Sequence, residues 1–335
     1  MSWIIVSVWP TTTEKDKLLK LYENWVRILR FNFSHRNHED VEKILINIQE
    51  VENQVAWDFC LLADLRWPWI RTWDREVPIT YNYWETFKVV SKKNLVDIPQ
   101  TMFCDYKNLV RDIAVDNKIV IDSGLFEAKV IEKKKDHIIV KALNTATLTS
   151  KRHINLPWTS VKLPSLTDKD KEDVLFAAKN HFDYVALSFV RKQEDVQSLK
   201  EFLNYNKIFN IKVIAKIENQ DWIKNIWDII NVSDAIMIAR WDLWAELPIE
   251  TIPDHQMRII KKTKREWKKV IVATQMLESM INNPIPTRAE ISDIFYAVMQ
   301  WADYLMLSWE TSIGKHPIKC VRIMNKVISE AQKYI

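Results

Sequence analysis

Charged residues follow short apolar segments of this chain, and their types fit one kind of chemistry. Lys216 and Glu218 stand two residues apart at the end of one such segment, and Asp242 follows the next one. Mg²⁺ in proteins is bound by one or two carboxylates together with substrate oxygens and water. Arg30, Lys216 and Arg240 add positive charge. Phosphoryl transfer depends on positioning, a divalent ion and such cations, so these residues indicate a phosphoryl-transfer site.

A second group of side chains supplies neutral and acidic oxygens. Arg30, Asn32 and Ser34 alternate along one segment, so that a strand would place all three on one side. Asp64 ends the following segment, and Thr274 ends a later one. Oxygens of this kind could bind a second cation.

Eight short apolar segments predict the strands that must position these residues. Most are aliphatic and nearly continuous, which is typical of strands buried on both faces. Amphipathic stretches lie between many of them, so strands and helices alternate and a (β/α)8 TIM barrel of the α/β class is expected, with functional residues at the carboxyl ends of its strands. The segments are Ile4–Val8, Val26–Phe31, Cys60–Leu65, Tyr184–Phe189, Ile211–Ile217, Ala235–Ala239, Lys269–Ala273 and Asp303–Leu307.

More than a hundred residues separate the third segment from the fourth. Short alternating runs within this span predict a small β-barrel domain inserted after strand three. The expected division is residues 1–72 for the first part of the barrel, 73–157 for the insertion and 158–335 for the second part.

Composition excludes several classes of protein. Hydrophobic content of 47% and charged content of 27% indicate a globular chain and exclude a disordered one. A net charge of +4 is too balanced for a nucleic-acid partner, and no segment is apolar enough to span a membrane. Three widely spaced cysteines fit a reducing compartment, so a cytoplasmic protein is expected.

Several segments together resemble the pyruvate kinase family over nearly the whole chain. The resemblance implies transfer of a phosphoryl group from phosphoenolpyruvate to ADP, giving pyruvate and ATP, with the inserted domain as a mobile lid. The segments that carry it are Arg30–His35, Ala63–Arg66, Ser188–Arg191, Ala215–Asn219, Ile238–Arg240, Val272–Met280 and Pro286–Glu290.

The resemblance also implies roles for individual residues. The catalytic residues would be Lys216, Thr274 and Arg30, and substrate would contact Arg30, Lys216, Trp241, Asp242 and Thr274. Mg²⁺ or Mn²⁺ would be bound by Glu218 and Asp242, and K⁺ by Asn32, Ser34, Asp64 and the Leu65 carbonyl. The nucleotide would face Asn32, Phe33, Ser34, His35, Arg71 and Arg152.

Two departures from the family pattern limit what the resemblance implies. The family usually has a C-terminal regulatory domain, and this chain stops at the expected last barrel helix, so effector control is not expected and a homodimer through the barrel is the most that carries over. Trp69 stands where the family often has Glu or Lys at a position that helps decide potassium dependence. The requirement for K⁺ is therefore open.

The third departure is the presence of sixteen tryptophans and only two glycines, where about 23 glycines would be expected. Twelve tryptophans fall where the family has glycine, at turns that favour residues tolerating positive φ. We hypothesise that a codon read as glycine in the source organism has been read here as tryptophan. The twelve are Trp9, Trp25, Trp67, Trp73, Trp84, Trp158, Trp222, Trp241, Trp244, Trp267, Trp301 and Trp309.

Three other interpretations stay open at this stage. Another Mg²⁺-dependent barrel acting on an enolpyruvate, such as an aldolase or lyase, would share the metal-binding carboxylate. A barrel whose tryptophans are literal could be catalytically impaired, since Trp241 would stand against the substrate. A non-catalytic binding module would not need Mg²⁺-dependent phosphoenolpyruvate binding.

Overall fold

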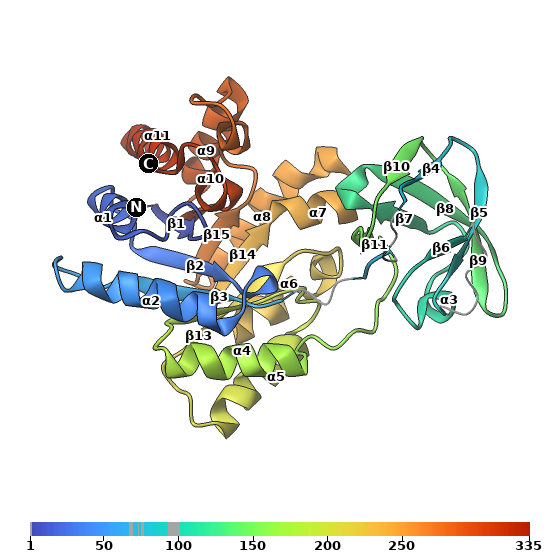
Figure 1. The fold of residues 1–335 in the computed structure, drawn as a ribbon, viewed down its shortest axis with the longest axis horizontal. Helices are drawn as coiled ribbons and strands as arrows, with labels where there is room; N and C mark the ends of the chain where they lie inside the picture. The colour runs from blue at the N-terminus through green and yellow to red at the C-terminus, as the bar shows by residue number, and fades with distance from the viewer. Residues whose placement is uncertain (1, 67–69, 73, 75–76, 93–100) are drawn as a thin grey trace. The chain divides into compact units, whose positions relative to one another are not determined.

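Eight parallel strands close into a barrel in the computed structural model of the protein, which describes residues 2–66, 70–72, 74, 77–92 and 101–335 (Figure 1). Around the barrel the strands follow chain order, and every neighbouring pair is parallel. The expected TIM barrel is confirmed. The strands are β1 (Trp3–Ser7), β2 (Ile28–Asn32), β3 (Cys60–Asp64), β12 (Tyr184–Leu187), β13 (Lys212–Ile217), β14 (Ala235–Ala239), β15 (Lys269–Ala273) and β16 (Tyr304–Leu307).

Apolar side chains fill the barrel interior. Ile5, Leu62, Ala186, Met237 and Met306 come from five different strands and belong to one buried cluster. Neighbouring residues on these strands are buried as well, because helices cover the outer face of a parallel barrel. The nearly continuous apolar sequence of the strands is explained by this two-sided burial.

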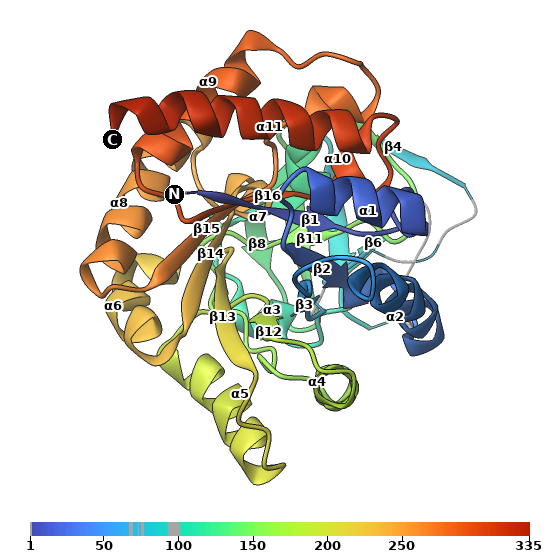
Figure 2. The same cartoon turned by 90° about the vertical axis from the view of Figure 1, so that its left-hand side faces the viewer.

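Helices ring the barrel, as Figure 2 shows. Two of them begin with reciprocal capping boxes, in which Thr167 pairs with Asp170 and Thr287 pairs with Glu290. The helices of this unit are α1 (Lys15–Glu23), α2 (His38–Glu52), α4 (Asp168–Lys179), α5 (Gln193–Tyr205), α6 (Trp222–Val232), α8 (Ile252–Arg265), α9 (Arg288–Met299), α10 (Trp309–Ser312) and α11 (Pro317–Ala331).

A second compact unit, Pro68–Pro164 with Trp241–Ile252, interrupts the barrel after β3, as expected. Its strands form a six-stranded sheet and a two-stranded sheet over a separate apolar core. The predicted domain limits at residues 72 and 157 stay predictions. The elements are β4 (Ile79–Tyr81), β5 (Thr86–Val90), β6 (Thr101–Phe103), α3 (Leu109–Asp112), β7 (Lys118–Ile121), β8 (Phe126–Lys133), β9 (His137–Ala142), β10 (Ala146–Leu148) and β11 (Ile154–Asn155), and α7 (Arg240–Glu246) leads into the unit's second segment.

Across the part of the chain described above, no helix combines the length and the apolar character that a bilayer crossing requires.

Among the tryptophans that the structure describes, six adopt a backbone conformation that favours glycine. Their φ angles lie between 56° and 115°, in the region where a bulky side chain is strained. All six belong to the twelve positions at which the family has glycine, and none of Trp3, Trp57 and Trp227, which fall outside that set, has a positive φ. The six are Trp9, Trp25, Trp84, Trp158, Trp267 and Trp301.

Three of these six tryptophans follow helices in the same motif. After α1, the Trp25 amide donates to the Tyr22 carbonyl and the Val26 amide donates to the Leu21 carbonyl. Trp267 and Trp301 stand in the same pattern after α8 and α9. This is the Schellman arrangement, whose left-handed residue is usually glycine.

Four of the twelve positions do not need a positive φ. Trp222, Trp241, Trp244 and Trp309 lie within or at the start of helices, so the expectation that they occupy left-handed turns is wrong. Two more, Trp67 and Trp73, lie outside the described residues, as does Trp69.

If the six positive-φ positions are glycine in the native protein, its mass will show the difference. We expect the intact protein from its source organism to be lighter than the printed sequence requires, because glycine is far smaller than tryptophan. Intact-mass spectrometry with peptide sequencing checks this expectation. A native mass equal to that of the printed sequence would contradict it.

Candidate active site

A buried lysine lies at the carboxyl end of the barrel between two acids. The Lys216 ammonium is 3.0 Å from Asp64 Oδ1 and 2.8 Å from Glu218 Oε1, and it donates a hydrogen bond to Ser188 Oγ at 2.8 Å. Asp64 and Glu218 are almost fully buried, and Lys216 is 8% exposed. Three expected site residues from two different strands are therefore in direct contact.

Arg30 on β2 extends this cluster of charges. Its Nε and Nη2 both lie 2.7 Å from Asp64 Oδ2, and its Nη1 donates to Ser7 Oγ at 2.7 Å. The order Arg30, Asp64, Lys216, Glu218 thus alternates in sign, with two positive and two negative groups. Because the four charges balance, a bound divalent ion would leave the cluster net positive and suited to a phosphate.

Burial affects the two acids differently. Burial by itself would raise the pKa of Asp64, but the ion pairs with Lys216 and Arg30 outweigh it and hold that pKa below its ordinary value. Burial raises the pKa of Glu218, and the ion pair with Lys216 offsets this only in part. Of these two acids, Glu218 is therefore the one whose negative charge is compensated less by neighbouring cations.

The surroundings of Glu218 fit a ligand of a hard cation. Its Oε2 accepts a hydrogen bond of 2.5 Å from the Phe189 amide, and Phe189 has a φ of 56°. No group of three or more His, Cys, Asp or Glu in the described ranges is arranged to hold a metal. A site with one or two carboxylates, completed by substrate and water, is the pattern that Mg²⁺ uses.

The expected potassium ligands lie at the ends of β2 and β3. Asn32 and Asp64 are partners in the strand register, so they stand side by side. The Ser34 amide donates to Asn32 Oδ1 at 3.0 Å, and Ser188 Oγ donates to the Leu65 carbonyl at 3.0 Å. These contacts fix several of the oxygens, while the binding of K⁺ itself stays a prediction.

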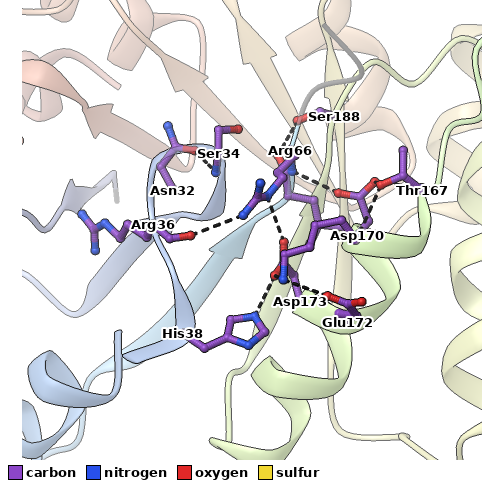
Figure 3. A network of polar contacts seen from close by, with 12 residues as sticks. Asn32, Ser34, Arg36, His38, Arg66, Thr167, Asp170, Glu172, Asp173 and Ser188 are labelled. Atoms are coloured by element: carbon purple, nitrogen blue, oxygen red, sulfur yellow. Dashed lines mark hydrogen bonds and ion pairs between the residues drawn. The ribbon is translucent and has the colours of Figure 1, made fainter. Parts of the chain in front are cut away.

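A polar network outside the predicted set holds the same loops (Figure 3). The Arg66 amide donates to Asp170 Oδ1, its Nη2 donates to the Arg36 carbonyl, and its Nε lies 3.3 Å from Asp173. His38 Nε2 lies 2.7 Å from Asp173 Oδ1. Sequence analysis named Arg66, within the family segment Ala63–Arg66, but did not identify this network. The spacing of Thr167 and Asp170 was one signal for the start of α4, but nothing in the sequence shows that Asp173 pairs with residues a hundred positions away.

The structure corrects two further expectations. Phe33 is fully buried against Phe176 and Phe182, so its side chain does not face a nucleotide and only its backbone is left for a ligand. Arg240 was expected as a cation available to a phosphate, but protein groups already surround it. Its guanidinium is bonded to the Asp293 carboxylate and to the carbonyls of Thr274 and Gln275.

Four expected site residues belong to the second unit, and His35 lies in a short 3-10 turn, Phe33–His35, after β2. Arg152 Nη1 is 3.2 Å from Asp122 Oδ2, and the Arg71 amide donates to Asp105 Oδ1. The Trp241 indole donates to Ser123 Oγ at 2.8 Å. Asp242 follows Trp241 in the first turn of α7. The roles of these residues toward nucleotide, substrate and metal stay predictions.

A closed parallel barrel with buried, paired charges at its carboxyl end defines the (β/α)8-barrel class, in which this rim carries the active site. The family model described as "Pyruvate kinase, barrel domain" matches residues 1–321. The chain belongs to the pyruvate kinase family.

Individual relatives agree with this assignment. The chain is 36% identical over 326 residues to a pyruvate kinase of Geobacillus stearothermophilus, covering 97% of this chain and 56% of the relative. It is 36% identical over 331 residues to one of Borreliella burgdorferi, covering 99% and 68%. It is 38% identical over 326 residues to plastidial pyruvate kinase 3 of Arabidopsis thaliana, covering 97% and 57%. The chain thus spans little more than half the length of two of these three relatives.

A solved structure has the same fold. The crystal structure of a pyruvate kinase from Cryptosporidium parvum superimposes with a TM-score of 0.96 at 34% identity, covering all of this chain and 70% of that one.

Proposed function

We propose that this protein is a pyruvate kinase, which transfers the phosphoryl group of phosphoenolpyruvate to ADP and forms pyruvate and ATP. Family membership supports the proposal. The observation that carries it is the contact of Lys216 with both Asp64 and Glu218 at the carboxyl end of the barrel. The two acids hold the ammonium in place, so its charge is already positioned before substrate arrives.

The cations of the cluster have distinct proposed roles. Arg30 would bind the phosphate of phosphoenolpyruvate, and the paired Asp64 and Ser7 fix the direction of its guanidinium. Lys216 would stabilise the phosphoryl group as it moves from the enol oxygen of phosphoenolpyruvate to the terminal phosphate oxygen of ADP. Thr274 would lie beside the enolate carbon that gains a proton.

Metal ions would complete the site. Glu218 and Asp242 would bind Mg²⁺ or Mn²⁺, which when bound supplies positive charge to the phosphoryl oxygens. Asn32, Ser34, Asp64 and the Leu65 carbonyl would bind K⁺. The Asn32–His35 segment, with Arg71 and Arg152, would face ADP, and the second unit would exclude water as a lid.

The oligomeric state and the cellular location are proposed as well. The family resemblance supports a homodimer formed through the barrel. Cys60, Cys104 and Cys320 are free thiols, which supports a cytoplasmic location.

The alternatives differ from this proposal in their need for ADP. An aldolase or lyase that binds enolpyruvate on a metal would act without a nucleotide. A barrel impaired by the Trp241 indole at the substrate position would show little or no turnover. The printed protein and a variant with all twelve tryptophans replaced by glycine, called here the twelve-glycine variant, separate these cases.

We expect the twelve-glycine variant to form pyruvate from phosphoenolpyruvate only when ADP and Mg²⁺ are both present. A dehydrogenase-coupled assay, repeated without ADP and with a metal chelator, measures this dependence. Pyruvate formation that continues without ADP would mean that the phosphoryl group is transferred to water, and would contradict transfer to ADP. Absence of pyruvate under all conditions in a folded variant would refute the proposed function.

A further inference from the structure

The residue proposed to stand beside the enolate carbon has a strained backbone. Thr274 has a φ of 68° and Gln275 a φ of 54°, directly after β15. The left-handed conformation is strained for residues other than glycine. Two in succession persist only if contacts from elsewhere in the fold hold them.

Arg240 supplies those contacts from the end of the neighbouring strand. Its Nε donates to the Thr274 carbonyl at 3.2 Å, and its Nη2 donates to the carbonyls of Thr274 at 2.5 Å and Gln275 at 3.0 Å. Arg240 is 5% exposed, so water competes little for these bonds. A planar guanidinium can bond two successive carbonyls in this way, whereas a lysine ammonium lacks the fixed fork.

The other edge of the guanidinium is held by two helices. Arg240 Nη1 lies 2.6 Å and 2.8 Å from the carboxylate oxygens of Asp293 on α9, and 3.4 Å from Gln256 Oε1 on α8. Gln256 Nε2 in turn donates to Gln300 Oε1 at 2.8 Å. The arginine is therefore fixed against the outer helices while it bonds the strained turn.

From these contacts we infer that Arg240 is a positioning residue, which keeps Thr274 and Gln275 in their left-handed conformation and so sets the place of the Thr274 side chain. The importance of that place for enolate protonation rests on the proposed function. The conformational role does not, because it follows from the hydrogen bonds alone.

Hydrogen–deuterium exchange of the peptide spanning residues 273–277 tests the conformational role. In the R240M variant we expect these amides to exchange about tenfold faster than in the parent protein, since hydrogen bonds to a charged group are lost. R258M is the matched control, because Arg258 is an exposed arginine of α8 that pairs with Asp254 on the same helix. It should leave exchange at residues 273–277 unchanged.

Two further variants separate the loss of bonds to the turn from the charge left on Asp293. R240M/D293N removes that charge, and R240K keeps a cation opposite it. The inference requires faster exchange in the double variant and an intermediate value in R240K. Exchange equal to the parent in R240M, or restored to it in the double variant, would overturn the inference.

A kinetic readout links the turn to chemistry. Protonation of the enolate carbon is reversible, so the enzyme should exchange the methyl protons of bound pyruvate with D₂O, each proton leaving C3 as the enolate forms. We expect R240M to lower both kcat and this exchange by about a hundredfold with little change in the KM for phosphoenolpyruvate. These kinetic measurements use the twelve-glycine variant as the parent. If that variant forms no ATP, the proposed function fails, and hydrogen exchange at residues 273–277 still decides the role of Arg240.

Discussion

Replacing Lys216 by alanine in the twelve-glycine variant is expected to lower kcat by about a thousandfold. The ammonium lies 3.0 Å or less from both Asp64 and Glu218, in a site from which water is largely excluded. A positioned positive charge in such surroundings stabilises charge that develops in the transition state far more than it would in water.

The fold should survive the loss of Lys216. Asp64 keeps its pair with Arg30, whereas Glu218 loses its ion pair with Lys216. Burial already raises the pKa of Glu218, so we expect this acid to take up a proton rather than stay charged and unpaired. The variant should therefore unfold at lower denaturant concentration but with the same cooperativity.

Steady-state kinetics with phosphoenolpyruvate and ADP, alongside denaturant unfolding, check this prediction. Lys212→Ala is the matched control, because Lys212 begins the same strand at its exposed end. It should keep full turnover. A Lys216→Ala variant that also kept near-full turnover would mean that the central residue is misassigned.

Replacing the six positive-φ tryptophans by glycine is expected to raise the free energy of unfolding by about 6 kcal/mol, or about 1 kcal/mol for each site. Each substitution relieves a left-handed conformation that costs about 1 kcal/mol or more. The sites are far apart in the sequence and in different loops, so their effects should be nearly additive. Exposure of Trp25, Trp84, Trp158, Trp267 and Trp301 ranges from 59% to 94%, so little buried contact is lost in exchange.

Chemical denaturation of the parent and the six-glycine variant measures this gain. Trp227→Gly is the control, because Trp227 lies inside α6 without a positive φ. There glycine should lower stability by about 1 kcal/mol. A six-glycine variant no more stable than the parent would contradict the strain argument. The fold does accept other residues in such turns, since His181 and Lys207 also have positive φ.

The barrel could be predicted from the sequence because each of its eight strands has its own local signal, a short run of apolar residues. Strands such as β14 and β15 have the bounds predicted from their apolar residues, since burial on both faces leaves an unbroken signal. The contact of Lys216 with Glu218 was likewise accessible, because strand periodicity places residues two apart on one side.

The rest of the site depends on pairings that no spacing reveals. The sequence suggested that Arg240 is a free cation at a strand end. In the structure its guanidinium forms an ion pair with Asp293, more than fifty residues later in the chain. Phe33 lies among polar site residues, but the packing of Phe176 and Phe182 buries it. The prediction that the four helical tryptophans occupy left-handed turns was wrong. A glycine at such a position in the family can allow close packing of the backbone as well as a positive φ.

The most direct test of the central claim is to follow the phosphoryl group itself. Phosphorus NMR of the twelve-glycine variant with phosphoenolpyruvate, ADP, Mg²⁺ and K⁺ should show the phosphoenolpyruvate signal replaced by the three signals of ATP. The same variant carrying Lys216→Ala should show almost no conversion over that time. Free phosphate in place of ATP, or no conversion by a folded twelve-glycine variant, would contradict the assignment of this site to phosphoryl transfer between phosphoenolpyruvate and ADP.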